Sequence, residues 1–100
     1  MNINPFDLLK NAKQIQEQMG AFQEKLGNIQ AIGFSGGGMV EVELNGRMEV
    51  EEVRISPELM EGRDRELLQD LVAAAFNNAM EKIREAINRE MGVSMGLASL

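Results

Sequence analysis

The side chains that usually carry out enzyme chemistry are scarce in this sequence. It contains no Cys and no His, which excludes thiol nucleophiles, zinc sites built on thiolates and the usual proton shuttle near neutral pH. It contains no Tyr or Trp and only four Phe, so a groove of stacking aromatic rings for single-stranded nucleic acid is not expected. We therefore predict no catalytic residue, no metal site, no cofactor and no small-molecule substrate.

A glycine triplet and a group of glutamates remain as candidates for a chemical site. The triplet occupies residues 36–38 and is followed by Met39, Val40 and Glu41, which begin a strand. A phosphate-binding loop instead needs a Lys and a hydroxyl residue at the start of a helix. The glutamates could attract Mg²⁺ or act as paired carboxylates, but no loop of alternating Asp and Asn ligands accompanies them. We favour a bent strand connection and a solvated acidic face.

Basic side chains on two predicted helices are the best candidates for a binding surface. They are Lys10, Lys13, Lys82, Arg84 and Arg89. The net charge of −6 disfavours nucleic acid on average, and ion pairing with Glu17 and Glu85, each four residues away from a base, is the alternative role. If the two helices pack antiparallel, the five cations converge at one end. A dimer would then present two such ends, which could contact duplex phosphates without reading bases.

The first predicted helix carries a coiled-coil pattern. Asn4 suits its N-cap and Pro5 its first position. Apolar residues then alternate at intervals of four and three, at Leu8, Ala12, Ile15, Met19, Phe22, Leu26 and Ile29. Such a seam belongs either to a core helix that lies on a sheet or to a helix that partly projects from the body. At 1.5 Å per residue the helix would be about 37 Å long, which favours projection.

The middle of the chain predicts a three-stranded antiparallel sheet. Asn45 and Gly46 mark a hairpin. A three-residue loop over residues 45–47 pairs Leu44 with Met48 and Val42 with Val50, and places Glu43 opposite Glu49. One extra residue at 51–52, a β-bulge, then sets Val40 opposite Val53. The hairpin would have one apolar and one acidic face.

The last predicted helix begins after Asp64, a suitable N-cap, and runs over residues 65–91. Residues 71–76 are apolar all round, and a helix of this kind is buried on more than one side. A second copy of the chain would supply the extra burial. The predicted dimer interface consists of Leu71, Val72, Ala74, Ala75 and Phe76.

The overall prediction is one α+β domain over residues 1–91, followed by a flexible tail over 92–100. The longest charge-free stretch, residues 71–80, is about half the length of a membrane span. The N-terminus has no basic cluster followed by an apolar run, so it does not resemble a secretory signal. We therefore expect a cytoplasmic protein that does not enter a membrane.

Nearly the whole chain resembles the YbaB/EbfC family of nucleoid-associated proteins. The similar segments are SGGGMV at residues 35–40, LNG at 44–46, VRISPEL at 53–59 and DLVAAAFNNA at 70–79. The resemblance implies an intertwined, tweezer-like homodimer that binds double-stranded DNA through its projecting first and last helices, with effects on nucleoid organisation and gene expression. No catalytic or base-reading motif comes with it, so we expect low sequence specificity. The alternative is a protein-binding adaptor for replication or recombination factors whose DNA affinity is incidental.

Overall fold

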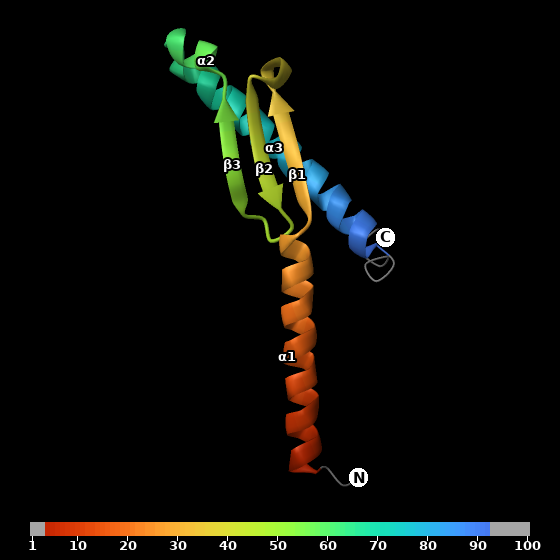
Figure 1. The fold of residues 1–100 in the computed structure, drawn as a ribbon. Helices are drawn as coiled ribbons and strands as arrows, with labels where there is room; N and C mark the ends of the chain where they lie inside the picture. The colour runs from red at the N-terminus through yellow and green to blue at the C-terminus, as the bar shows by residue number, and fades with distance from the viewer. Residues whose placement is uncertain (1–3, 93–100) are drawn as a thin grey trace.

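The computed structural model describes residues 4–92 and has the α+β architecture that the sequence predicts, a long helix, a small sheet and a second long helix (Figure 1). The elements are helix α1 (Pro5–Gly27), strand β1 (Gln30–Ser35), the turn η1 (Gly36–Gly38), strands β2 (Val40–Asn45) and β3 (Val50–Ile55), and helices α2 (Pro57–Glu61) and α3 (Arg65–Met91). The sheet is antiparallel with the order β1-β2-β3. The two predicted N-caps are confirmed, because Asn4 and Asp64 accept hydrogen bonds from Phe6 and Leu67 N–H groups.

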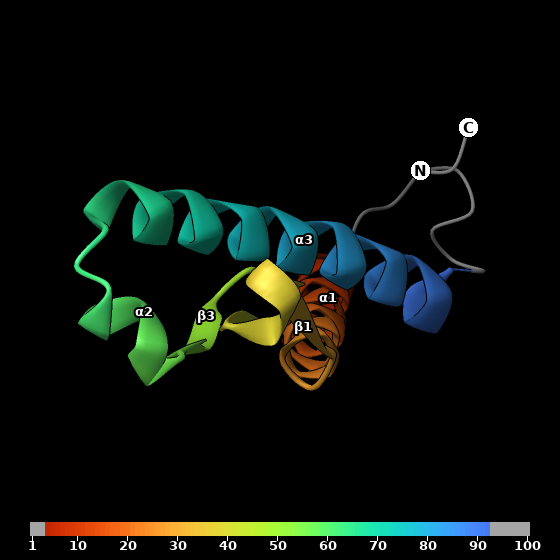
Figure 2. The ribbon, with the colours of Figure 1, turned by 90° about the horizontal axis from the view of Figure 1, so that it is seen from above.

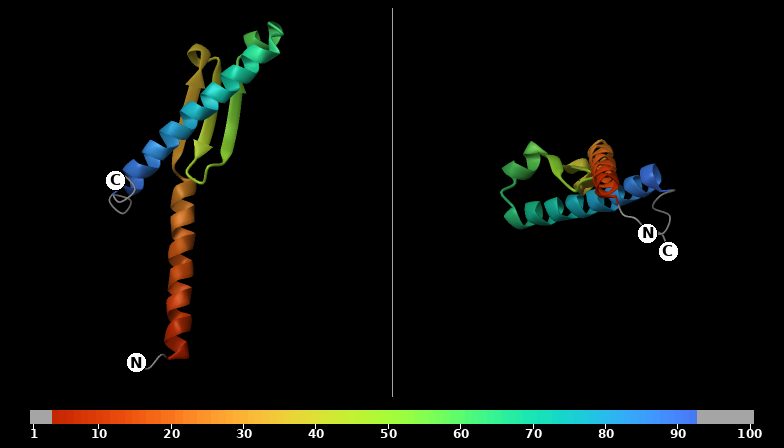
Figure 3. Two further views of the ribbon diagram at one scale, coloured as in Figure 1. Left: turned by 180° about the vertical axis from the view of Figure 1, so that it is seen from behind. Right: turned by 90° about the horizontal axis from the view of Figure 1, so that it is seen from below.

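The core lies between α3 and the central strand. On β2, Val40, Val42 and Leu44 alternate with glutamates and are at most 1% exposed. Their partners on α3 include Ala79 and Ile83, which are fully buried. α3 packs mainly on β1 and β2, and it crosses the sheet diagonally (Figure 3). Five of the six residues of β3 are consequently exposed.

Helix and sheet meet backbone to backbone at Gly33, in the middle of β1. A Cβ atom added there would collide with the backbone nitrogen of Ala79 and the carbonyl oxygen of Ala75. Glycine is therefore required by the close approach of α3 and not by backbone conformation. The small side chains of Ala75 and Ala79 allow the same approach from the helix side.

Helix α1 projects away from the rest of the molecule and has no buried residue (Figure 1). Its apolar seam is open to solvent, with Leu8 and Ile15 56% exposed and Met19 61% exposed. The interpretation of this helix as a core helix on the sheet is therefore wrong for the single chain, and the projecting interpretation is confirmed. Only its last turn is anchored, because the Gly46 N–H group donates to the Leu26 carbonyl at 3.0 Å.

The predicted register of the hairpin is wrong. Leu44 pairs with Val50, whereas Val42 pairs with Val53. The predicted pairs Leu44–Met48, Val42–Val50 and Glu43–Glu49 do not form, and Val40 lies opposite Ile55. The predicted β-bulge is confirmed. Leu44 pairs with Val50 and Glu43 pairs with Glu52, so Glu51 is the extra residue on β3.

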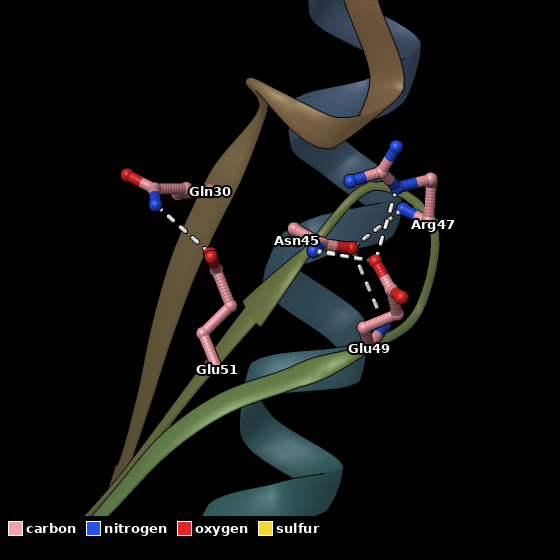
Figure 4. A network of polar contacts seen from close by, with 5 residues as sticks. All are labelled: Gln30, Asn45, Arg47, Glu49 and Glu51. Atoms are coloured by element: carbon pink, nitrogen blue, oxygen red, sulfur yellow. Dashed lines mark hydrogen bonds and ion pairs between the residues drawn. The ribbon is translucent and has the colours of Figure 1, made fainter. Parts of the chain in front are cut away.

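The loop is longer than predicted because the Asn45 side chain organises it. Its Oδ1 accepts hydrogen bonds from the N–H groups of Arg47 at 2.9 Å and Glu49 at 3.3 Å, and its Nδ2 donates to the Glu49 carboxylate (Figure 4). Met48 takes up a left-handed conformation with φ 63°. These bonds keep residues 46–49 in the turn, which shifts every pairing that follows.

The outer face of the sheet is less acidic than predicted. Arg54 lies among three glutamates, with nitrogen–oxygen distances of 2.6 Å to Glu41, 2.9 Å to Glu52 and 3.6 Å to Glu43. The corrected register produces this cluster, because it places Arg54 opposite Glu41. A single guanidinium thus compensates part of the repulsion between neighbouring carboxylates.

The glycine triplet forms the turn between β1 and β2, as the interpretation of a bent strand connection requires. Gly36, Gly37 and Gly38 all have positive φ, at 58°, 67° and 95°, a region that other residues rarely occupy. The predicted tail begins at Gly92, and residues 93–100 lie outside the described part of the chain. Within residues 4–92, no helix is long and apolar enough to cross a membrane.

The contact at Gly33 predicts a large effect of one methyl group. Gly33→Ala forces α3 away from β1, and overpacking of this kind destabilises a fold by about 1–3 kcal/mol. Gly20→Ala is the matched control, because a Cβ there meets nothing within 4 Å and alanine favours a helix by about 1 kcal/mol. Urea unfolding should show a lower midpoint for the first variant alone. Equal midpoints would contradict the packing described.

Candidate nucleic-acid interface

Lys10 and Lys13 lie on the projecting part of α1, where both side chains are exposed. Among residues 4–92, every ion pair involves Arg47 or Arg54. The pairs considered for Lys13 with Glu17 and for Arg89 with Glu85 are therefore not formed. Lys25, which the sequence analysis did not single out, lies in the last turn of the same helix and is also exposed.

The three basic residues of α3 differ in their surroundings. Arg84 and Arg89 are exposed. Lys82 lies against the sheet, where its Nζ donates to the Ile32 carbonyl oxygen at 3.3 Å and sits 4.8 Å from the centre of the Phe34 ring. An ammonium group has three donors, so Lys82 can hold the edge of β1 and still direct N–H groups outward.

The two groups of cations do not meet within one chain. α1 does not pack along α3. It leaves the end of the sheet where β1 begins, and α3 extends past that same end at an angle (Figure 1). Lys10 and Lys13 belong to the start of α1, far from this junction. The antiparallel packing considered for the two helices is thus wrong for the protomer, and the five cations form two separate groups, in which Lys82 alone is partly buried.

An apolar groove of about 550 Å³ lies between β3 and the first half of α3. Its apolar lining residues are Ile55, Leu68, Val72, Ala73 and Phe76. Of the residues predicted for a dimer interface, Val72 and Phe76 line this groove and Ala74 is exposed. Leu71 is half-buried near Gly36, and Ala75 is fully buried against β1 within the protomer.

The apolar segment 71–76 therefore serves two surfaces of α3. Ala75, Ala79 and Ile83 recur at intervals of four and face the sheet. Leu68, Val72 and Phe76 recur at the same interval on the neighbouring face, beside the uncovered strand β3. The sequence predicted burial on more than one side, and within one chain only the first of these faces is covered.

These features together give two separate groups of basic residues and an apolar surface that nothing covers within one chain. Within residues 4–92, no group of three or more acidic side chains is arranged to hold a metal ion. The sequence is matched over residues 1–97 by the YbaB/EbfC DNA-binding family. The chain belongs to this family. Its members are described as DNA-binding, which agrees with the exposed cations.

Similar proteins occur in other bacteria. Nucleoid-associated proteins of Legionella pneumophila strains Corby and Paris are each 45% identical to this chain over 86 residues, which cover 86% of this chain and 76% of the relative. The crystal structure of the uncharacterized protein HP0035 from Helicobacter pylori is 25% identical and has a TM-score of 0.69, with 97% of this chain and 99% of the other covered. This likeness confirms the α+β fold.

The hairpin loop that flanks the base of α1 predicts a pH dependence. Hydrogen bonds from Asn45 and then from Arg47 lower the pKa of the Glu49 carboxylate below its ordinary value near 4.5. A carboxylate whose pKa is lowered by folding stabilises the fold above its ordinary pKa, and this contribution is lost as the pH falls through the lowered value. The unfolding midpoint should therefore fall with pH below about 4.5. In the Glu49→Gln variant the unfolding midpoint should fall less steeply with pH, because the carboxylate is missing. A pH profile identical to that of the parent protein would contradict a stabilising role of Glu49.

Proposed function

We propose that this protein is a nucleoid-associated protein of the cytoplasm that binds double-stranded DNA as a homodimer with low sequence specificity, and so affects nucleoid organisation and gene expression. The observation that carries the proposal is the projecting helix α1, whose lysines are exposed and make no ion pair within residues 4–92. Residues 1–91 act as one domain in this account. The five proposed phosphate contacts are Lys10, Lys13, Lys82, Arg84 and Arg89.

Charge separation explains how an acidic chain can attract DNA. The carboxylates of β2 and β3 gather on the outer face of the sheet around Arg54. The proposed phosphate contacts instead lie on α1 and on the second half of α3, and the other unpaired cations include Lys25 at the end of α1 and Arg63 and Arg65 at the start of α3. Lysine and arginine contacts to phosphates fix the position of a protein on a duplex without reading its sequence. Low specificity and strong salt dependence follow from contacts of this kind.

The dimer is supported by apolar surface that the single chain leaves open. Most of the stability of a helix in a protein comes from tertiary packing of its apolar face, and the 23-residue helix α1 lacks such packing along most of its length. Its exposed seam and the groove beside β3 both need a cover, and contiguous apolar patches of this kind mark interaction sites. A second copy provides apolar surface of the same kind for both.

A protein-binding adaptor is the second candidate, and one observation favours it. Phe6 is 79% exposed and Leu9 69% exposed, and neither belongs to the heptad seam. They would remain at the tip of α1 after a second copy had covered the seam. A partner protein could use this tip, in which case DNA binding would be weak and incidental.

The DNA proposal predicts a steep loss of affinity with salt that depends on these cations. Lys10→Gln with Lys13→Gln, or Arg84→Gln with Arg89→Gln, should reduce the slope of log affinity against log salt by about 0.9 for each phosphate that is no longer neutralised. A salt-titrated binding assay with a duplex of fixed length measures the slope. Lys82 is left unchanged because its removal would also free the edge of β1.

The control for this experiment removes the same charge from the opposite end of α3. Arg63→Gln with Arg65→Gln also lowers the net charge by two, but these residues flank the start of the helix. For this control variant, the slope of log affinity against log salt should equal that of the parent protein. An affinity that does not respond to salt, or an equal reduction of the slope in all three double variants, would contradict the proposed contacts and favour the adaptor.

The homodimer predicts a sedimentation mass near twice 11.1 kDa at micromolar concentration. Ala74→Glu places a charge on an exposed position of the apolar segment predicted for the dimer interface, so it should lower the mass towards that of one chain while helix content by circular dichroism is retained. The control Glu81→Ala alters an exposed residue of the same helix and should leave the dimer intact. A parent protein that sediments as a monomer would refute this part of the proposal.

A further inference from the structure

The two most exposed large apolar side chains of residues 4–92 both lie in the first turns of α1. Phe6 is 79% exposed and Leu9 is 69% exposed. Apolar side chains stabilise a fold when they are removed from water, and neither of these two is removed from water within the chain. The fold therefore does not account for a phenylalanine and a leucine at these positions.

Phe6 and Leu9 share one side of α1 with two lysines. Lys10 follows Phe6 by four residues and Lys13 follows Leu9 by four, an interval that places side chains on the same side of a helix. We call these four exposed residues the tip patch. At 3.6 residues per turn, its centre lies about 140° around the helix from the heptad seam. A molecule that covers the seam would therefore leave the tip patch open.

The start of α1 holds the backbone of Phe6 in place. Asn4 Oδ1 accepts a hydrogen bond from the Phe6 N–H group at 2.9 Å, and the Asn4 carbonyl accepts one from the Leu8 N–H group at 3.1 Å. Pro5 occupies the first position of the helix, and its ring fixes its own φ. With the backbone fixed, an aromatic side chain has only two torsion angles left to order, so binding it costs little conformational entropy.

Helix α1 carries the tip patch away from the rest of the molecule. No other element lies beside its first turns in Figure 1. Figure 2, in which α1 is seen almost end-on, shows that α3 crosses it and does not run beside it. The helix is about 35 Å long at 1.5 Å per residue, and the glutamates around Arg54 lie on the sheet at its other end. The tip patch can therefore touch a large anion without bringing that acidic face close to it.

We propose that Phe6 inserts between two stacked base pairs of a DNA duplex from the minor groove, with Leu9 packed beside it and with Lys10 and Lys13 on the neighbouring phosphates. The inference rests on the proposed DNA binding and assigns the apolar half of the tip patch a part in it. A helix is about 10–12 Å wide and the minor groove about 6 Å, so only side chains at the end of α1 can enter. Apolar wedges of this kind partly unstack a base step and kink the duplex.

The neighbours of Phe6 favour DNA over a partner protein as the occupant. Lys10 and Lys13 make no ion pair within residues 4–92, and the nearest carboxylate in the sequence, Asp7, lies about 110° around the helix from the centre of the tip patch. In a duplex, every stacked base step is flanked by phosphates. An apolar group with cations on one side of it therefore matches a duplex wherever the helix docks.

Insertion of this kind agrees with low sequence specificity. It reads no base edge, because the ring contacts the faces of the bases that it separates. The energy needed to open a step depends on the sequence, and pyrimidine–purine steps such as TA are the most easily kinked or unstacked. We therefore expect a preference for TA-rich duplexes that depends on Phe6 and not on the lysines.

A duplex that contains 2-aminopurine tests the insertion, because the fluorescence of this adenine analogue rises when it is unstacked. The full-length protein should raise the fluorescence of a short duplex with 2-aminopurine at several TA steps, and energy transfer between dyes at the two ends should report a bend. Phe6→Ala should abolish both signals and lower the affinity on the order of tenfold, through the loss of an aromatic contact with a base. The slope of log affinity against log salt should stay unchanged, because Lys10 and Lys13 are retained.

Two further variants serve as controls. Phe6→Leu should keep part of the fluorescence rise, since leucine also acts as a wedge in duplexes. Met60→Ala removes a 60% exposed apolar side chain from α2, at the opposite end of the molecule, and should match the parent protein in fluorescence, bend and affinity. Alanine favours a helix more than phenylalanine does, so Phe6→Ala should retain its helix content by circular dichroism. Equal losses in Phe6→Ala and Met60→Ala would overturn the assignment to Phe6.

The remaining outcomes separate the insertion from the proposed function. A parent protein that binds with a steep salt dependence but leaves 2-aminopurine stacked and the duplex straight would overturn the insertion and leave the proposed function standing. A Phe6→Ala variant with the fluorescence and bend of the parent protein would also overturn the insertion, and would leave Phe6 and Leu9 to a partner protein. A parent protein that does not bind the duplex would overturn the proposed function and the insertion together.

Discussion

The close approach of α3 to β1 at Gly33 determines much of what this molecule can do. The helix is drawn against β1 and β2 because Gly33, Ala75 and Ala79 leave room for its backbone. In that position its side chains occupy the edge of β1, and its first half extends beyond the sheet. Strand β3 and the neighbouring groove remain bare as a consequence. The contact at Gly33 therefore determines which apolar surfaces are covered within a single chain and which remain exposed to another molecule.

The distribution of charge follows from the same arrangement. The sheet turns its apolar face to α3, so the alternating glutamates of β2 face outward, where Arg54 compensates part of their charge. The helices carry cations on surfaces that do not touch this acidic face. The formal net charge of −6 is therefore unevenly distributed, and α1, with Lys10, Lys13 and Lys25 against Asp7, Glu17 and Glu24, has a net charge of zero.

The parts of the fold that depend on local signals could be predicted from the sequence. Caps at Asn4 and Asp64 and the apolar periodicities indicated both long helices, and the extra residue at Glu51 was visible as a change of phase. The strand register could not be predicted, because the Asn45 side chain lengthens the loop through bonds that leave no periodic signal. The position of Lys82 was equally hidden, since Ile32 and Phe34 meet it only through the tertiary packing of α3. A heptad seam cannot by itself distinguish a projecting helix from a core helix.

The central claim is that two copies act together on one duplex, since the cations of one chain form two separate groups and its apolar surfaces are incomplete. Native mass spectrometry of the protein with a short duplex, long enough for a single binding event, tests this claim most directly. The account predicts that the smallest complex contains two chains for each duplex, and that complexes with a single chain are absent at protein concentrations above the dimer dissociation constant. A stable complex of one chain with one duplex under those conditions would contradict it.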